Sequence, residues 1–209
     1  MLRFTYFTRK MNSMPINDLS QLDLNKRYTY ADYLTWRFRE RVELLRGRIA
    51  RMSPAPGKKH QQVSGELFFQ LKLQLRESSY EIFSAPFDVR LPIPKQESPN
   101  TVVQPDICII CDPEKLDDRG CKGAPDLVVE ILAPGNTHRE MEEKYRLYEE
   151  AGVREYWLVD PEHEAVFPYL LSEAGQFIGQ PPQAGRGVLQ AHIFPNLAID
   201  LEALFQAIR

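Results

Sequence analysis

Apolar residues recur along the chain with two different periods, which predict a mixture of helices and strands. From Val63 to Leu75 every fourth residue is apolar, and this spacing predicts an amphipathic helix over residues 60–77. In a later polar stretch, Thr137 and Glu140 fit a capping box and Gly152 fits a helix stop. A second helix is therefore expected between Thr137 and Gly152.

Shorter apolar runs bounded by Pro, Gly and Asp predict strands. The predicted elements are a short helix within 28–39 capped by Thr29 and Asp32, a hairpin within 42–52 turning at Arg46-Gly47, strands within 80–91, at 101–111, 125–132 and 153–160, a meander within 165–194 and a helical tail at 200–208. Residues 53–59, 92–100 and 112–124 are expected to be loops because of their Pro, Gly and Asp content. Strands and helices in this order predict an α/β or α+β fold around a mixed sheet.

Length and composition favour one globular domain. The chain has 209 residues, 43% hydrophobic and 26% charged, and no apolar stretch long enough for a membrane span. Residues 1–27 are expected to be an N-terminal leader, in which Met11 and Met14 are alternative start sites, and residues 28–209 a single domain.

The cysteine count favours a reducing compartment. An odd number of cysteines, three, predicts a cytoplasmic protein without a disulfide framework. Cys108 and Cys111 stand three residues apart in a predicted strand, so they point to opposite faces, and no second Cys or His pair follows at zinc spacing. We expect two buried thiols.

Basic residues are concentrated in one segment. Residues 37–59 contain eight Lys or Arg and two acids, whereas the net charge of the whole chain is −3. This segment is either a phosphate-facing surface or a solvated hairpin and helix start, and the charge pattern alone does not separate the two.

Two acids interrupt otherwise apolar strands. In residues 125–132, alternation places Asp126, Val128, Glu130 and Leu132 on one face. Asp106 lies in an earlier strand between apolar neighbours. A buried carboxylate costs several kcal/mol unless a cation or hydrogen bonds compensate it, so Glu130 is either a satisfied structural acid or half of a site. Two strands that each present an acid suggest that the acids converge, and a carboxylate pair with water ligands is a typical Mg²⁺ site.

A lysine lies on the packing face of the helix that follows Glu130. Helical phase places Lys144 within the inward stripe that contains Tyr148 and Ala151. From there it can reach Glu130, orient a water or stabilise charge on a phosphate. The alternatives are that Lys144 extends to solvent or forms a purely structural ion pair with Glu130.

Residues 102–110, "VVQPDICII", and 123–162, from "GAPDLVVEIL" to "YWLVDPE", resemble the Uma-two family of restriction-endonuclease-like proteins. This family is a branch of the PD-(D/E)xK nuclease superfamily. The similarity extends from about Tyr28 to the C-terminus and includes "VELLRGRIARMSP" and "HIFPNLAIDLEALF". It implies a restriction-endonuclease-like mixed central β-sheet flanked by α-helices, with a metal site on two neighbouring strands.

The resemblance also assigns residues. Asp106 matches the first acid of the motif and Glu130 the second, but the usual lysine position, two residues later, is occupied by Leu132. Related branches have a lysine on the next helix, and Lys144 is the candidate here. Glu43 matches an early family glutamate that is either an additional metal ligand or an exposed hairpin residue.

Two other residues have weaker assignments. Asp126 is either a further metal ligand or a strand-start acid that binds backbone. His60, at a predicted helix start, is either a phosphate contact or a surface histidine.

The expected function is Mg²⁺-dependent (or Mn²⁺-dependent) hydrolysis of DNA phosphodiester bonds in the cytoplasm. Asp106, Glu130 and Lys144 would be catalytic, and Asp106, Glu130 and, as a further candidate, Glu43 would bind the metal. The expected nucleic-acid contacts are Arg46, Arg48, Lys58, Lys59 and His60. Two alternatives remain open: a catalytically inactive nucleic-acid-binding protein and a protein-interaction module on the same fold. No membrane association is expected, and a homodimer is compatible with the sequence.

Overall fold

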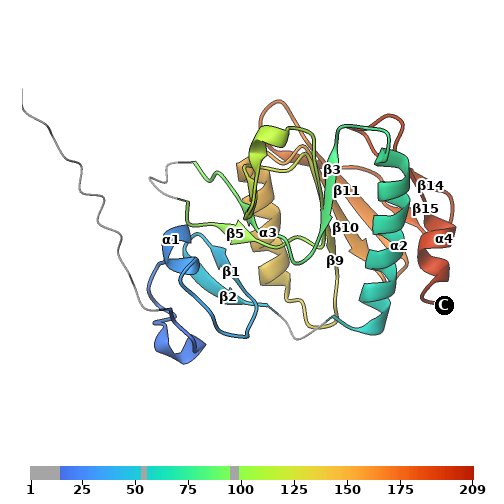
Figure 1. Cartoon of the computed structure of the whole chain (residues 1–209). Helices are drawn as coiled ribbons and strands as arrows, with labels where there is room; N and C mark the ends of the chain where they lie inside the picture. The colour runs from blue at the N-terminus through green and yellow to red at the C-terminus, as the bar shows by residue number, and fades with distance from the viewer. Residues whose placement is uncertain (1–14, 53–55, 95–98) are drawn as a thin grey trace, which may run out of the picture.

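A mixed central sheet forms the middle of the molecule (Figure 1). The computed structural model describes residues 15–52, 56–94 and 99–209, so the predicted loops 53–59 and 92–100 lie partly outside the described residues. Within these ranges the sheet has seven strands in the order β12-β11-β10-β9-β6-β3, with β13 paired to β11. Their bounds are β3 Glu81–Ser84, β6 Ile107–Ile110, β9 Leu127–Ile131, β10 Glu155–Asp160, β11 Ala165–Leu171, β12 Phe177–Gly179 and β13 Gln183–Ala184. Because β9 and β10 are parallel and the other pairs antiparallel, the predicted mixed sheet is confirmed.

Helices cover both faces of the central sheet. Helices α2 (Lys58–Leu75) and α4 (Leu201–Gln206) lie on one face and α3 (His138–Ala151) on the other (Figure 1). The predicted Thr137–Glu140 capping box is present, and Gly152 ends α3 in the left-handed conformation. The sheet and its helices thus form the layered arrangement that the sequence predicts.

Strand β9 is buried on both faces, which explains its continuous apolar sequence. Leu127, Val129 and Ile131 pack into the core beneath α2 and α4. Val128 packs into the core beneath α3, and alternation puts Glu130 on that same side. The expected shared face of Val128 and Glu130 is confirmed.

A second sheet carries the basic hairpin. Its strand order is β2-β1-β5-β4-β8-β7. The bounds are β1 Val42–Leu45, β2 Arg48–Arg51, β4 Val89–Arg90, β5 Val102–Val103, β7 Leu116–Asp117 and β8 Gly120–Lys122. The predicted hairpin is confirmed, with Arg46 (φ 52°) and Gly47 (φ 82°) both in the left-handed region, as a two-residue hairpin turn requires.

The predicted strand 101–111 is two strands in different sheets, which corrects the sequence prediction. Val102–Val103 pairs with β1 and β4, whereas Ile107–Ile110 pairs with β3 and β9. Pro105 lies at the break, where its missing N–H removes a ladder donor. The chain therefore crosses from one sheet to the other between Gln104 and Asp106.

The predicted loop 112–124 also contains regular structure: a 3-10 helix (Pro113–Lys115), β7 and β8. Gly120 makes this possible, because at φ 115° it approaches the backbone oxygen of Asp88 so closely that a Cβ would lie 2.1 Å from it. Arg90 then forms two hydrogen bonds to the carboxylate of Asp117, at 2.7 and 2.8 Å. Sequence composition alone does not reveal such a pairing.

The C-terminal segment departs partly from the predicted meander. Strands β11 to β13 continue the central sheet, but β14 (Val188–Gln190) pairs only with β15 (Ala198–Asp200) as a separate ribbon among the described residues. The predicted helical tail is confirmed as α4, with Asp200 as its N-cap.

The N-terminal segment packs an aromatic cluster against the second sheet. Helix α1 (Tyr30–Tyr33) has the predicted Thr29–Asp32 capping box. Leu19 and Leu22 are buried in the same cluster as Trp36. Residues 1–14 of the predicted leader lie outside the described residues, and the domain boundary at residue 28 stays a prediction. None of the described helices is long and apolar enough to cross a membrane.

Candidate active site

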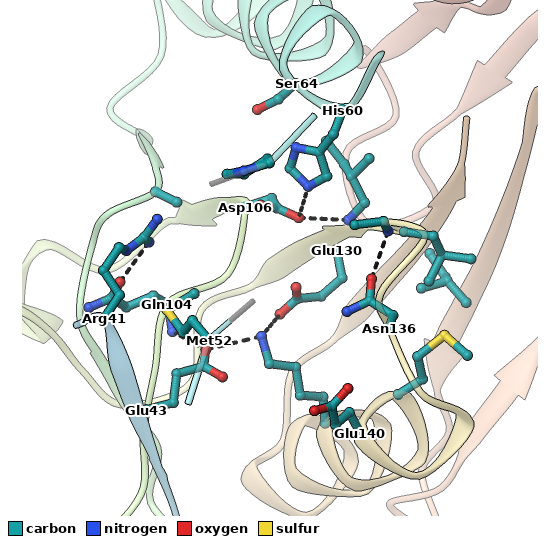
Figure 2. Close-up of a pocket in the computed structure, with 18 of the residues that line it drawn as sticks. Arg41, Glu43, Met52, His60, Ser64, Gln104, Asp106, Glu130, Asn136 and Glu140 are labelled. Atoms are coloured by element: carbon teal, nitrogen blue, oxygen red, sulfur yellow. Dashed lines mark hydrogen bonds and ion pairs between the residues drawn. The ribbon is translucent and has the colours of Figure 1, made fainter. Parts of the chain in front are cut away.

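Asp106 and Glu130 lie on neighbouring strands of the central sheet. The β6–β9 register pairs Ile107 with Val129, which places Asp106, the residue before β6, opposite Glu130. Opposite residues of an antiparallel pair share a face, and both acids line one pocket of about 340 Å³ (Figure 2). The predicted adjacency of the two acids is confirmed.

Asp106 is held in place by one backbone group and one side chain. Its Oδ2 accepts a hydrogen bond from the Ile131 backbone N–H at 2.8 Å and lies 3.2 Å from Nε2 of His60 (Figure 2). Among the described residues, none donates a hydrogen bond to its Oδ1. One carboxylate oxygen of Asp106 therefore remains free for a ligand in the pocket.

Lys144 of α3 connects two carboxylates. Its Nζ lies 2.9 Å from Oε1 of Glu130 and 3.0 Å from Oε1 of Glu43. The lysine side chain is 18% exposed, so it does not extend to solvent. Helical phase identified its direction, and the ion pair with Glu130 is present.

Glu43 is a buried member of this group. It comes from β1 of the second sheet, is 5% exposed, and accepts a 2.8 Å hydrogen bond from the Gln104 backbone N–H. This geometry excludes the exposed-hairpin interpretation of Glu43. The group Glu43–Lys144–Glu130 joins the two sheets through α3.

Tyr148 is a further member that sequence reasoning assigned only to packing. Its hydroxyl donates a 2.5 Å hydrogen bond to Oε1 of Glu130. Tyr148 lies one helical turn after Lys144, so both reach the same carboxylate from one face of α3. The i, i+4 spacing of Lys144 and Tyr148 is the sequence signal that points to Tyr148 as a second partner of Glu130.

The charges in this group perturb one another. Burial raises the pKa of Glu130, and the negative charges of Asp106 and Glu43 raise it further. Together these effects outweigh the positive charge of Lys144, so the pKa of Glu130 is about 7. Burial lowers the pKa of Lys144, but Glu130 and Glu43 outweigh it and raise this pKa above its usual value. Lys144 therefore stays protonated over the physiological range.

His60 faces Asp106 from the first turn of α2. Burial lowers its pKa, but the hydrogen bond and charge of Asp106 and the charge of Glu130 outweigh burial and raise it. Its Nδ1 is buried without a hydrogen-bond partner among the described residues. His60 is buried, so it is not a surface histidine.

The predicted nucleic-acid contacts do not gather at the pocket. Arg46 pairs with Glu150 at 2.7 Å and Lys59 with Glu162 at 2.9 Å. Arg48 and Lys58 are exposed, but of the five predicted contacts only His60 lines the pocket. Two other arginines of the basic segment 37–59, Arg41 and Arg51, line the pocket. The charge pattern of the segment does not distinguish them from its other basic residues.

Asp126 and the cysteines lie outside the pocket. Asp126 accepts hydrogen bonds from the Cys111 backbone N–H (2.8 Å) and from Arg154 (3.1 Å). Burial raises its pKa, but these donors outweigh burial and lower it, so Asp126 has the backbone-binding role. Cys108 and Cys111 pack on opposite faces of the sheet as predicted, although Cys111 is only half-buried.

The carboxylate oxygens of this pocket suit a hard divalent cation. Asp106 Oδ1 and Glu130 Oε2 have no hydrogen-bond donor among the described residues. Lys144 contacts two carboxylates, Glu43 and Glu130, and the Asp106 carboxylate adds negative charge near Glu130, which a cation would relieve. No group of three or more His, Cys, Asp or Glu side chains among the described residues is arranged to hold a metal. Two carboxylates with waters and substrate phosphate are nevertheless the usual ligands of Mg²⁺.

Comparisons with known proteins agree with this architecture. No curated protein matches the chain. The crystal structure of "a putative nuclease belonging to DUF820" from Anabaena variabilis ATCC 29413 superposes with a TM-score of 0.66 and 18% identity, covering 86% of this chain and 98% of that one. The two chains share a restriction-endonuclease-like fold. Residues 30–202 match the family described as "Uma2: Putative restriction endonuclease", and the chain therefore belongs to the Uma2 family.

Proposed function

We propose that this protein is a Mg²⁺- or Mn²⁺-dependent nuclease that hydrolyses DNA phosphodiester bonds. The observation that carries the proposal is the pair Asp106, just before β6, and Glu130, opposite it on β9, with Lys144 against Glu130 in one pocket. The family description and the naming of the similar Anabaena structure as a nuclease point to the same class of reaction.

Asp106 and Glu130 would hold the metal through their free oxygens. A bound Mg²⁺ would polarise the scissile phosphate and lower the pKa of a water. The contacts of Asp106 with Ile131 and His60 fix its free oxygen in position. The Tyr148 hydroxyl does the same for Glu130.

Lys144 would act as a fixed positive charge. Because its raised pKa keeps it protonated, it is unsuited to remove a proton from water. An ammonium group has three N–H donors, and Glu43 and Glu130 occupy two of them. The third is available to a phosphate oxygen, whose negative charge increases during the displacement.

His60 would position Asp106. Its Nε2 faces Asp106, and its Nδ1 lacks a partner among the described residues. A protonated imidazole donates from both nitrogens, so Nε2 would donate to Asp106 Oδ2 and orient this carboxylate, whereas the buried Nδ1 is not accessible to a substrate.

The test is cleavage of single-stranded DNA, duplex DNA and RNA with Mg²⁺ or Mn²⁺, comparing the wild type with Glu130→Gln. We expect metal-dependent cleavage of DNA, a loss of at least about 10²-fold in the variant, and no cleavage in EDTA. Equal rates in the two proteins, or no cleavage of any substrate by the wild type, would overturn the proposal and favour the catalytically inactive alternatives.

A further inference from the structure

A second groove of about 510 Å³ lies beside the candidate active site. Arg41 and Gln104 line both hollows and are hydrogen-bonded to each other at 2.8 Å, at the edge of the pocket in Figure 2. A chain bound in the active-site pocket could therefore continue into this groove. Its walls come from α1, from the segment that connects α1 to β1, and from the second sheet.

One wall of the groove is a row of aromatic rings. The ring centroids of Tyr33 and Trp36 are 5.5 Å apart, and those of Trp36 and Phe38 are 5.6 Å apart and stacked. Tyr33 and Phe38 are half-buried, so part of each ring remains accessible. Such rings are suited to stack against nucleobases.

Two polar atoms of this wall lack partners. The Tyr30 hydroxyl and Trp36 Nε1 are buried and form no hydrogen bond with any described residue. Trp36 is 8% exposed. Because both atoms are inaccessible from the groove, a bound chain would contact the ring faces of this wall and not its polar atoms.

The charge of the groove is positive. It is lined by four arginines and two acids: Arg37, Arg39, Arg41, Arg119, Glu40 and Asp88. Asp88 already accepts hydrogen bonds from Tyr33 (3.2 Å) and Gln104 (2.8 Å). Among the described residues, no side chain pairs with the exposed guanidinium groups of Arg39 and Arg119.

We propose that this groove binds single-stranded nucleic acid leading to or from the active site. Unpaired bases would stack on the aromatic wall and phosphates would contact Arg39 and Arg119, the combination typical of single-strand sites. Paired bases in a duplex cannot reach such a wall. An acidic peptide would match the arginines but not the ring faces. The inference rests on the proposed nuclease function and adds a substrate class to it.

Binding can be measured without cleavage, by fluorescence anisotropy of a labelled single-stranded oligonucleotide in EDTA. The test variant is Arg39→Gln/Arg119→Gln. The control is Arg76→Gln/Arg186→Gln, which removes the same charge from exposed positions outside both hollows. We expect the test variant to bind at least about tenfold more weakly and to show a salt dependence, log Kd against log salt, that is shallower by roughly 1.4. An equal effect of the control pair would overturn the proposal.

Phe38→Leu tests stacking separately, because leucine retains apolar packing against Trp36 but has no ring face. We expect at least about fivefold weaker binding of the single strand, with duplex binding unchanged. Equal losses for single strand and duplex, or tighter wild-type binding of an acidic peptide than of the oligonucleotide, would refute the groove assignment. Normal groove binding in EDTA without cleavage in Mg²⁺ would instead reject only the proposed nuclease function.

Discussion

At Glu130, two donors from one turn of α3 offset part of the free energy of burying a carboxylate. Lys144 Nζ lies at 2.9 Å and the Tyr148 hydroxyl at 2.5 Å from the same oxygen. Lys144 Nζ also forms an ion pair with Oε1 of Glu43 at 3.0 Å. Because breaking such a buried group leaves an uncompensated charge, substitutions here affect stability as well as chemistry.

Lys144→Met illustrates this double effect. Methionine retains most of the apolar stem but leaves Glu43 and Glu130 without their shared cation, so we expect a loss of about 3 kcal/mol or more in the free energy of unfolding. Cleavage should fall by at least about 10²-fold. Urea unfolding and single-turnover cleavage measure the two effects.

The double variant Lys144→Met/Glu43→Gln separates them. It removes one positive and one negative charge, so much of the stability should return while cleavage remains low. Recovery of cleavage together with stability would show that Lys144 has only a structural role.

Glu130 also predicts a pH dependence for the metal-free protein. Its pKa of about 7 in the folded state exceeds the usual 4.5. The folded state therefore binds more protons than the unfolded state between these values, and stability falls as pH rises from about 4.5 to 7. Relative to Glu130→Gln, the wild type should lose on the order of 1–3 kcal/mol across this window. Urea unfolding in EDTA at several pH values measures the difference, and parallel profiles would contradict the raised pKa.

At the scale of elements, α3 and β9 are the parts that the sequence predicts best. Their signals are local: a capping box at Thr137, a stop at Gly152 and an apolar run around Glu130. The sequence does not predict the crossing at Pro105. The strands that pair with β5 and β6, such as β1 and β3, lie far from them in the chain. Local pattern cannot choose between two sheets when both flanks are equally apolar.

The cap of α3 fixes the helix that carries Lys144. The Thr137 hydroxyl accepts a 3.2 Å hydrogen bond from the Glu140 N–H, so Thr137→Ala should cost about 1 kcal/mol. Thr137→Ser keeps the hydroxyl and should cost much less. Urea midpoints with unchanged m-values would measure both. Equal losses in the two variants would mean that the methyl group, and not the cap, stabilises the helix.

At the scale of the whole molecule, the candidate active site is assembled from segments that only the fold brings together. Glu43 comes from the second sheet, Asp106 from the crossing between sheets, and Lys144 from α3. Spacing identified Asp106, Glu130 and Lys144 because each breaks or shares an apolar pattern. It left Glu43 unresolved and did not distinguish Arg41 from its basic neighbours, because period shows which residues share a face but not which distant segment covers that face or where a pocket forms.

This assembly predicts that a divalent cation stabilises the fold. A ligand that binds only the folded state adds about 2.7 kcal/mol at one hundred times its Kd, which corresponds to roughly 5–10 °C in Tm for a chain of this size. Mg²⁺ should therefore raise the Tm of the wild type, measured against KCl at equal ionic strength. Glu130→Gln and Asp106→Asn should lose most of this rise, because each removes a free carboxylate oxygen from the pocket. Asp126→Asn is the matched control, since its carboxylate binds Cys111 and Arg154 outside the pocket, and it should keep the full rise. If Glu130→Gln gained as much stability from Mg²⁺ as the wild type, the cation would bind elsewhere and the paired acids would not be its ligands.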